Sequence, residues 1–393
     1  MNDSKKCFSE YDLVCKLEEI ELNRRFLPYS IGSPKRSVTY DDAYERANIL
    51  FFSDSHIDFR NPVESLDNVR RTIEYSNNSP VTFDAVVNCG DAITPFQVRP
   101  KEDAYARFTP FFDEMKKSRS PVIYSMGNHD LNDWGNYPQN AFDDTDLGKL
   151  FFDYAEENYG IIRQIKDDNV KSSWHYYDIK SKKIRIVSVN IQDSDKETVN
   201  EEGKVRFYST FYVSQKQMQW ICDTALNFDD KEEKDWGVIF ALHQIPRKKH
   251  EEYPDAGEIL IKLCSAFNKG EKFTYNFTSE EFPFFNLDMN YDFSRYHDME
   301  KKPHMICWLL GHDHEDIVEV KEGINLIWTL NNSASTCCSD ARIARVLGTS
   351  TQNSFDIVNI DTRERKIRIF KYGAGVNCYG VGGDRFVPDG LDY

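Results

Sequence analysis

The sequence predicts an α/β fold of the α+β kind, in which β-sheets are covered by helices. Apolar strand patterns and amphipathic helix patterns alternate along the chain, and such alternation is typical of sheets with helices packed against them. Hydrophobic residues make up 40% of the 393 residues and aromatic residues 14%, which is enough for a substantial core. Five of the apolar runs end directly at a short polar signature, which places candidate functional side chains at strand ends.

The alternation is clearest in the first third of the chain, where the order is strand, helix, strand, helix, strand. These elements are expected, in that order, at 48–52, 62–77, 85–87, 101–117 and 122–124. Both helices carry apolar residues at helical spacing. Pro62 suits the first turn of its helix, because no backbone N–H is needed there.

The later elements continue the pattern. A helix, a β-hairpin, a helix capped by Ser214 and a strand are expected at 146–158, at 174–179 with 183–190, at 215–226 and at 238–242. After a helix at 257–268, the remaining strands are expected at 305–310, 317–320, 324–330, 355–360 and 366–370. No repeat or low-complexity linker divides the chain. We therefore expect an N-terminal extension at 1–46 and one domain at 47–393 with an insertion at about 250–303.

Charge and cysteine usage limit the kinds of partner and compartment. Lys and Arg number 49 against 65 Asp and Glu, so the net charge is −16 and stable binding to nucleic acid is not expected. The nine cysteines show no regular spacing and indicate a reducing compartment rather than a disulfide framework. The first residues lack the apolar run of a signal peptide, and no stretch is long and apolar enough for a membrane span. A cytoplasmic protein is expected, and its oligomeric state stays open.

The polar signatures combine the side chains that bind divalent metals. In chain order they are Asp54-Ser55-His56, Gly90-Asp91, Gly127-Asn128-His129-Asp130, a lone His243, and Gly311-His312-Asp313-His314. Carboxylate, imidazole and amide groups at the ends of neighbouring strands converge on one rim of a sheet. Two divalent metals held close together suit the hydrolysis of a phosphoester.

The spacing of these groups suggests which of them bind the same metal ion and which bridge two ions. Asp54 and His56 are two residues apart at a strand end, so both can face one ion. Asp91 follows a glycine that permits a tight turn, and its two oxygens can bridge two cations. A single histidine at a strand end is most often a structural residue with a hydrogen bond. Here, however, five of the nine histidines fall within the signatures, which favours a metal site.

The order of the signatures resembles that of the calcineurin-like metallophosphoesterase superfamily. Its pattern is Asp-x-His, Gly-Asp, Gly-Asn-His-(Asp/Glu), a lone His and Gly-His-x-His, which this chain matches from the strand before His56 to His314. The resemblance implies two mixed β-sheets packed face to face with flanking helices, a four-layer sandwich with its site at the strand ends.

The resemblance also implies a role for each signature residue. One metal would be held by Asp54, His56 and His314, and the other by Asn128, His243 and His312. Asp91 would bridge them. His129 would be the catalytic histidine beside the substrate, with Asp130 orienting it. The mixed oxygen and nitrogen donors suit two ions of Mn, Fe or Zn. Thr94 departs from the Asp, Asn or Tyr that many members carry three residues after the bridging Asp, which argues against the purple acid phosphatases.

These residues predict a metal-dependent phosphoesterase. It would hydrolyse a phosphodiester or phosphomonoester by attack of a metal-bridging hydroxide, with His129 assisting the leaving group. The expected partner is a small phosphorylated substrate, a nucleotide being one candidate. Two alternatives stay open: a nucleotide-type pyrophosphohydrolase using the same site, and a non-catalytic binding protein on the same fold.

Several further residues have two interpretations each. Asp58 either hydrogen-bonds a ligand histidine or stabilises its loop. The aromatic tract at 273–293 forms either a lid over the site or the packing of an insertion. Trp134 and Arg247 are weak candidates for substrate contact. Structural or surface roles are expected for the histidines outside the signatures, which are His175, His250, His297 and His304.

Overall fold

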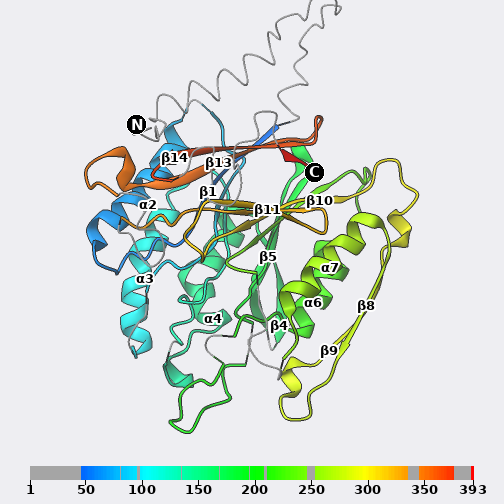
Figure 1. The fold of residues 1–393 in the computed structure, drawn as a ribbon. Coiled ribbons are helices and arrows are strands. Elements are labelled where there is room, and N and C mark those ends of the chain that lie inside the picture. The colour runs from blue at the N-terminus through cyan, green and yellow to red at the C-terminus, as the bar shows by residue number, and fades with distance from the viewer. Residues whose placement is uncertain are drawn as a thin grey trace, which may run out of the picture.

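The computed structural model describes residues 46–79, 81–94, 98–133, 135–167, 169–193, 195–207, 210–245, 253–334, 345–375 and 391–393. The predictions for Trp134, Arg247, His250 and nearly all of the 1–46 extension lie outside these ranges. Two large mixed β-sheets form the centre of the described structure, with helices on their outer faces (Figure 1).

The first sheet has six strands in the order β15-β14-β13-β1-β2-β3. Their bounds are β1 Arg46–Phe52, β2 Ala85–Asn88, β3 Val122–Tyr124, β13 Ser354–Asp361, β14 Lys366–Gly373 and β15 Leu391–Asp392. The strands β1, β2 and β3 run parallel, and β13 lies antiparallel to β1 with Leu50 opposite Ile357. Segments about 300 residues apart in sequence are therefore neighbours in this sheet.

The second sheet has seven strands in the order β11-β12-β10-β7-β6-β5-β4. Their bounds are β4 Ile162–Asp167, β5 Val170–Ile179, β6 Ile184–Ser188, β7 Gly237–Leu242, β10 His304–Leu310, β11 Ile317–Lys321 and β12 Ile324–Trp328. The four strands β12, β10, β7 and β6 are parallel at its centre. The predicted hairpin is confirmed as β5 and β6, which pair antiparallel.

Alternate residues of the strands face different cores. Ile49 and Phe51 of β1 pack between the sheets with Ile239 and Leu309 of the second sheet. Leu50 of β1 and its alternate neighbours face the helices α2 (Pro62–Asn78) and α3 (Lys101–Met115). On the other side, α6 (Gln215–Trp220) and α7 (Ala256–Lys269) cover the second sheet. The predicted four-layer arrangement of two face-to-face mixed sheets with flanking helices is confirmed.

The helices follow the predicted positions with two differences. The stretch predicted at 146–158 is α4 (Asp144–Leu147) and α5 (Asp153–Tyr159), joined without a break by a π-helical turn at Gly148–Phe152. Asp143 and Asp146 form a capping box that starts α4 two residues early. A second π-helical turn at Ile221–Ala225 continues α6.

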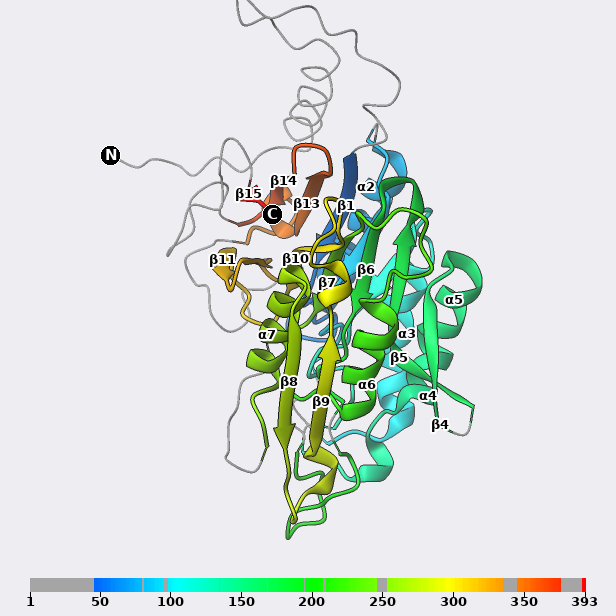
Figure 2. The ribbon, with the colours of Figure 1, turned by 90° about the vertical axis from the view of Figure 1, so that its right-hand side faces the viewer.

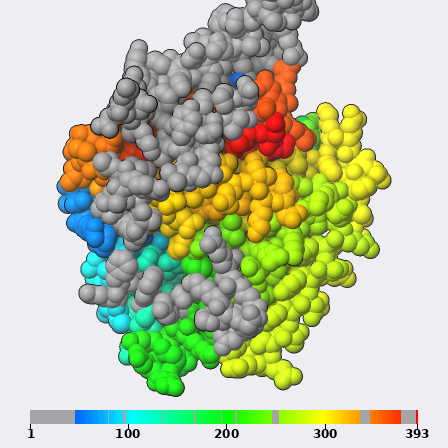
Figure 3. Space-filling view, viewed as in Figure 1, coloured from blue at the N-terminus to red at the C-terminus, as the bar shows by residue number. Residues whose placement is uncertain are grey.

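The expected insertion contains α7 and a separate two-stranded sheet of β8 (Lys272–Phe277) and β9 (Leu287–Asp292). The hairpin lies beside α6 and α7 on the outer side of the second sheet (Figure 2) and forms one flank of the molecular surface (Figure 3). Phe285 is fully buried, and its carbonyl oxygen accepts a hydrogen bond of 3.0 Å from the Tyr212 hydroxyl. These contacts fit the interpretation of the aromatic tract as packing.

Two further expectations concern cysteines and membranes. The described cysteines, Cys89, Cys222, Cys264 and Cys307, are buried and carry free thiols. Within the described ranges, no helix has the length and apolarity needed to cross a membrane.

Candidate metal centre

The five polar signatures lie at one edge shared by both sheets. The strands β1, β2 and β3 of the first sheet and β7 and β10 of the second all end there, and their signatures follow directly. Backbone hydrogen bonds continue between the loops beyond the strands. Asp54 N donates to Gly90 O at 2.9 Å, and Gly311 N donates to His243 O at 2.9 Å. The strand register therefore sets which signatures become neighbours.

The glycines of the signatures allow these loops to touch. A Cβ atom on Gly127 would overlap the Asp91 carboxylate, and one on Gly311 would overlap Asp54 and Ser53. Because glycine has no Cβ, the loop after β3 can lie against the loop after β2, and the loop after β10 against that after β1. Each glycine thus brings a candidate ligand against a neighbouring loop.

Five of the candidate ligands have left-handed backbone conformations. Their φ angles are 55° at Asp54, 40° at His56, 54° at Asp91, 65° at His312 and 53° at His314. Such conformations are uncommon outside glycine and are concentrated at functional sites, where the surrounding structure stabilises them. The turns redirect side chains from the strand ends toward a common point.

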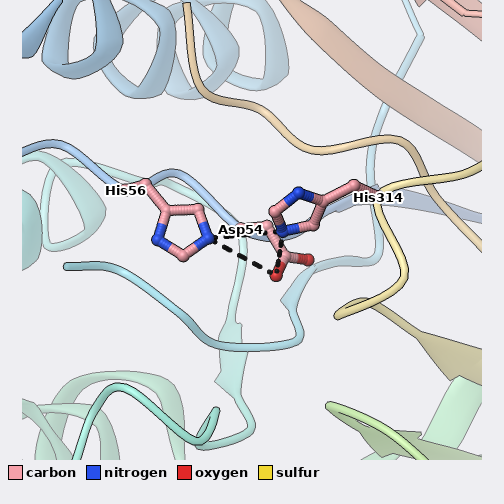
Figure 4. Close-up of side chains that lie close together, drawn as sticks. All are labelled: Asp54, His56 and His314. Atoms are coloured by element: carbon pink, nitrogen blue, oxygen red, sulfur yellow. Dashed lines mark hydrogen bonds and ion pairs between the residues drawn. The ribbon is translucent and has the colours of Figure 1, made fainter. Parts of the chain in front are cut away.

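Asp54, His56 and His314 form the first donor group (Figure 4). His314 Nε2 lies 3.1 Å from Asp54 Oδ1 and 3.3 Å from His56 Nε2. All three side chains are buried. The residues come from the loops after β1 and β10, so the group joins the two sheets.

The second donor group consists of Asp91, Asn128, His243 and His312. His243 Nε2 lies 3.0 Å from Asn128 Oδ1, 3.1 Å from His312 Nδ1 and 3.2 Å from Asp91 Oδ2. Asp91 Oδ2 is also 3.9 Å from His56 Nε2 of the first group. The structure therefore brings together all seven residues predicted as ligands, with Asp91 between the two groups.

Hydrogen bonds on the far side of two imidazoles indicate which nitrogen faces the site. His243 Nδ1 lies 2.6 Å from the carbonyl oxygen of Cys89, which can only accept. His56 Nδ1 lies 3.3 Å from the carbonyl oxygen of Ile93. In its neutral form, each ring therefore carries its proton on Nδ1 and directs an Nε2 lone pair at the other donors, as metal-binding histidines do.

The electrostatics of the groups favour a cation. Burial by itself raises the pKa of Asp54, but the charges of His314 and His243 lower it to about 2. Burial lowers the pKa of His56 to about 4 and that of His312 to about 3, so both rings are neutral at pH 7. Burial also lowers the pKa of His243, but Asp91 and Asp54 raise it to about 9. Two buried carboxylates therefore attract a proton when nothing else supplies positive charge.

The separations between donor atoms fit ions of the expected size. Ligand atoms about 2.1 Å from a shared ion lie about 3.0 Å apart in octahedral geometry and about 3.4 Å apart in tetrahedral geometry. The closest contacts within the groups, at 2.9 to 3.3 Å, match this range, while His56 Nε2 and Asp54 Oδ1 are 3.9 Å apart. Lone pairs facing one another at such distances need a proton or a cation between them. The residues present thus fit two metal ions.

His129 lies beside the donor groups without joining either. Its backbone N–H donates to Asp91 Oδ1 at 2.9 Å, and its Nε2 is 3.7 Å from Asp91 Oδ2. Its ring meets the His56 ring edge to face, with centroids 5.4 Å apart. A histidine in this position can reach a substrate bound across the two groups.

Asp130 makes contacts other than the one predicted from sequence. Its carboxylate accepts hydrogen bonds from the backbone N–H groups of Asp91, Ala92 and Gly127, and from the Tyr124 hydroxyl at 2.6 Å. Burial and the nearby Asp91 raise its pKa to about 6. No hydrogen bond joins it to the His129 ring among the described residues. Asp130 ties the loop after β2 to the loop after β3, and its catalytic role stays a prediction.

Three other residues near the site make contacts that the sequence did not predict. Among the described residues, Asp58 hydrogen-bonds no ligand histidine; it accepts a hydrogen bond from Thr94 N at 2.6 Å. The Thr94 side chain instead meets His56, with Oγ1 2.5 Å from Nδ1. Asp133 is buried four residues after His129 and pairs with Lys196 at 2.9 Å. Pairs that form only through loop packing leave no spacing pattern in a sequence.

Comparison with known proteins agrees with the geometry. The family model described as calcineurin-like phosphoesterase matches residues 47–316, more than half of the chain. No match was found among curated proteins.

Three solved structures show the extent of structural likeness. The protein TT1561 of Thermus thermophilus is 11% identical with a TM-score of 0.37, covering 82% of this chain and 97% of its own. An archaeal phosphodiesterase is 14% identical with a TM-score of 0.29, covering 82% and 99%. GAP50, the anchor in the inner membrane complex of Plasmodium, is 10% identical with a TM-score of 0.39, covering 83% and 84%. All three TM-scores are below 0.5, so the assignment depends on the family model: the chain belongs to the calcineurin-like phosphoesterase family.

Proposed function

We propose that this protein is a metal-dependent phosphoesterase that hydrolyses a phosphodiester or a phosphomonoester. The observation that carries the proposal is the pair of donor groups at the edge of both sheets, with Asp91 of the second group 3.9 Å from His56 of the first. Six donor side chains, nearly all buried, form two groups in which the ligand atoms lie within 4.8 Å of one another, and Asn128 Oδ1 lies 3.0 Å from His243 of the second group. A non-catalytic binding protein would not need this complete set.

We propose metal ligands on the basis of the two donor groups. Asp54, His56 and His314 would hold one ion, and Asn128, His243 and His312 the other, with Asp91 between them. When bound, two such ions neutralise phosphoryl oxygens and lower the pKa of water, so that a hydroxide nucleophile is available near neutral pH. We propose Mn, Fe or Zn as the ions, because the mixed donor set suits them.

His129 would act as the general acid for the leaving group. Its Nε2, on the side of Asp91, can hold a proton and donate it to the departing oxygen. Asp130 fixes the loop that carries His129 through its bond to Gly127 N.

The substrate would be small, and a nucleotide is one candidate. The net charge of −16 disfavours long polyanions. We also propose that residues 47–393 act as one domain. β13 and β14, which follow the part matched by the family model, complete the sheet that begins with β1.

Hydrolysis of bis-p-nitrophenyl phosphate and p-nitrophenyl phosphate tests this function. Protein treated with a chelator and then supplied with Mn²⁺, Fe²⁺ or Zn²⁺ should release p-nitrophenolate from at least one of the two esters. Asp91→Asn should lose most of that activity, whereas Asp223→Asn, an exposed position far from the signatures in sequence, should keep it. Folded wild-type protein that cleaves neither ester with any of the three metals would contradict the proposal.

A further inference from the structure

Thr94 makes a contact that is not accounted for by the ligand pattern. Its side chain is buried, and its Oγ1 lies 2.5 Å from Nδ1 of His56. The same nitrogen lies 3.3 Å from the carbonyl oxygen of Ile93. The carbonyl cannot donate, so a lone pair on Nδ1 would face it unfavourably. A proton on Nδ1 satisfies both oxygens and leaves the Nε2 lone pair for the first donor group.

The backbone of Thr94 is held as firmly as its side chain. Its N–H donates to Asp58 Oδ1 at 2.6 Å, and its carbonyl oxygen accepts from Arg99 Nη2 at 3.4 Å. Asp58 in turn pairs with Arg99 at 2.7 Å and with Arg107 of α3 at 3.5 Å. Every polar group of Thr94 therefore has a partner, and the chain of contacts runs from α3 to His56.

Arg99 extends this series of contacts to the loop that follows His129. Its backbone N–H donates to Asn136 Oδ1 at 2.9 Å, and its carbonyl oxygen accepts from Asn132 Nδ2 at 3.0 Å. Asp58 and Arg99 are largely buried, with side chains 6% and 13% exposed. Water therefore competes little for these contacts, which keep the Thr94 hydroxyl in one place.

We propose that Thr94 is a positioning residue for the metal ligand His56, held in place by Asp58 and Arg99. The proposal rests on the metal-dependent function above and adds to it. Partners on the far nitrogen of a ligand histidine fix its tautomer and ring orientation, and their loss typically lowers metal affinity about 10- to 100-fold. The hydroxyl of Thr94 would act in this way on the first donor group only, because no contact joins it to the second among the described residues.

The test is titration of Mn²⁺ into chelator-treated protein, followed by calorimetry. Wild-type protein should bind two ions. Thr94→Val, which keeps the shape and removes the hydroxyl, should bind one ion about 10- to 100-fold more weakly and the other unchanged. Thr94→Ser should restore the affinity, since it keeps the hydroxyl. Ser76→Ala is the control, because Ser76 is also buried and its hydroxyl donates to Ile73 O within α2.

Each result of this titration either supports or overturns the role proposed for Thr94. Two ions bound by Thr94→Val with wild-type affinities would overturn it while leaving the phosphoesterase function intact. Equal losses in Thr94→Ser and Thr94→Val would also overturn it, because the hydroxyl would then be irrelevant. A wild-type protein that binds no metal would refute both this inference and the proposed function. If Thr94→Val fails to fold, Thr94→Ala gives the same comparison with the same criteria.

Discussion

The Nε2 atoms of His56 and His314 face each other at 3.3 Å, although the residues are 258 positions apart in sequence. The Nδ1 of His56 already has two oxygen partners, so its Nε2 directs a lone pair at His314. Asp54 Oδ1 lies 3.1 Å from the same His314 nitrogen. A cation between these atoms removes the repulsion between donors that the fold otherwise holds together.

Metal removal should therefore destabilise the protein. A ligand that binds only the folded state at 100 times its dissociation constant stabilises it by about 2.7 kcal/mol. We expect chelator treatment to lower Tm and Mn²⁺ to restore it, measured by differential scanning calorimetry. His243→Ala, which lacks a ligand of the second group, should show a smaller rise with Mn²⁺. A wild-type Tm independent of both treatments would contradict the metal site.

His129→Asn should reduce turnover in a way that depends on the leaving group. Loss of a general acid costs about 10²- to 10⁴-fold in rate when the departing oxygen needs a proton. The effect should be large for a methyl or nucleoside ester and small for a p-nitrophenyl ester, whose phenolate leaves unaided. The measurement is kcat of His129→Asn for each of the two kinds of ester, with the exposed-site variant His297→Asn as the control. Equal losses for both esters would exclude the proton-donor role.

Gly127→Ala should impair metal binding. The added Cβ would overlap the Asp91 carboxylate, so the loop after β3 must move away from the shared ligand. We expect fewer than two Mn²⁺ per chain by elemental analysis of the purified variant. Gly148→Ala is the control, since its Cβ would meet no candidate ligand, only the Asp153 carboxylate at 3.1 Å and Arg163 Nη2 at 3.5 Å. Full metal content in Gly127→Ala would show that the close approach of the loops is unnecessary.

Acid should destabilise the fold partly through His175. This fully buried ring donates from Nδ1 to Ser173 O at 2.9 Å, and burial lowers its pKa to about 4. In the unfolded chain the pKa is about 6.5. Between these values the unfolded state binds a proton that the folded state does not, so the free energy of unfolding decreases as pH falls.

The size of this effect can be isolated by mutation. From pH 7.5 to pH 5, the loss of unfolding free energy should be about 2 kcal/mol smaller in His175→Asn than in wild type. Asparagine keeps a donor for Ser173 O and does not titrate. Urea unfolding at the two pH values measures the difference, with the exposed-site variant His297→Asn as control. The same loss in His175→Asn and wild type would exclude His175 as the source.

Lys371→Met should destabilise the protein much more than Lys366→Met on the same strand. The Lys371 ammonium is buried 2.9 Å from Asp316 and 3.5 Å from Asp356, and its removal leaves two buried carboxylates at a cost of about 3 to 5 kcal/mol. Lys366 pairs with the exposed Asp392, a contact worth about 1 kcal/mol or less. Urea unfolding compares the two variants, and adding Asp356→Asn to Lys371→Met should recover part of the loss. Equal destabilisation by the two substitutions would show that the buried Lys371 ammonium does not stabilise the protein more than the exposed pair does.

Most of the ligand set could be predicted because each residue ends an apolar run. His243 and His312 follow β7 and β10, whose continuous hydrophobic sequences mark buried parallel strands. The pairing of β13 with β1 could not be predicted, since nothing local in either strand encodes a neighbour about 300 residues away. The contacts of Thr94 and Lys371 could not be predicted from the sequence either, because they depend on how loops and strands pack in space.

The joining of both sheets at each donor group has a consequence for synthesis on the ribosome. Asp54 and His314 are 260 residues apart, and at usual elongation rates roughly 15 to 50 seconds separate their emergence. The first group cannot form before His314 has emerged, nor the second before His312. Until β13 is made, β1 also lacks one of its two neighbours. Metal loading is therefore a late event, and the nascent chain passes through a long interval with its N-terminal strand half paired.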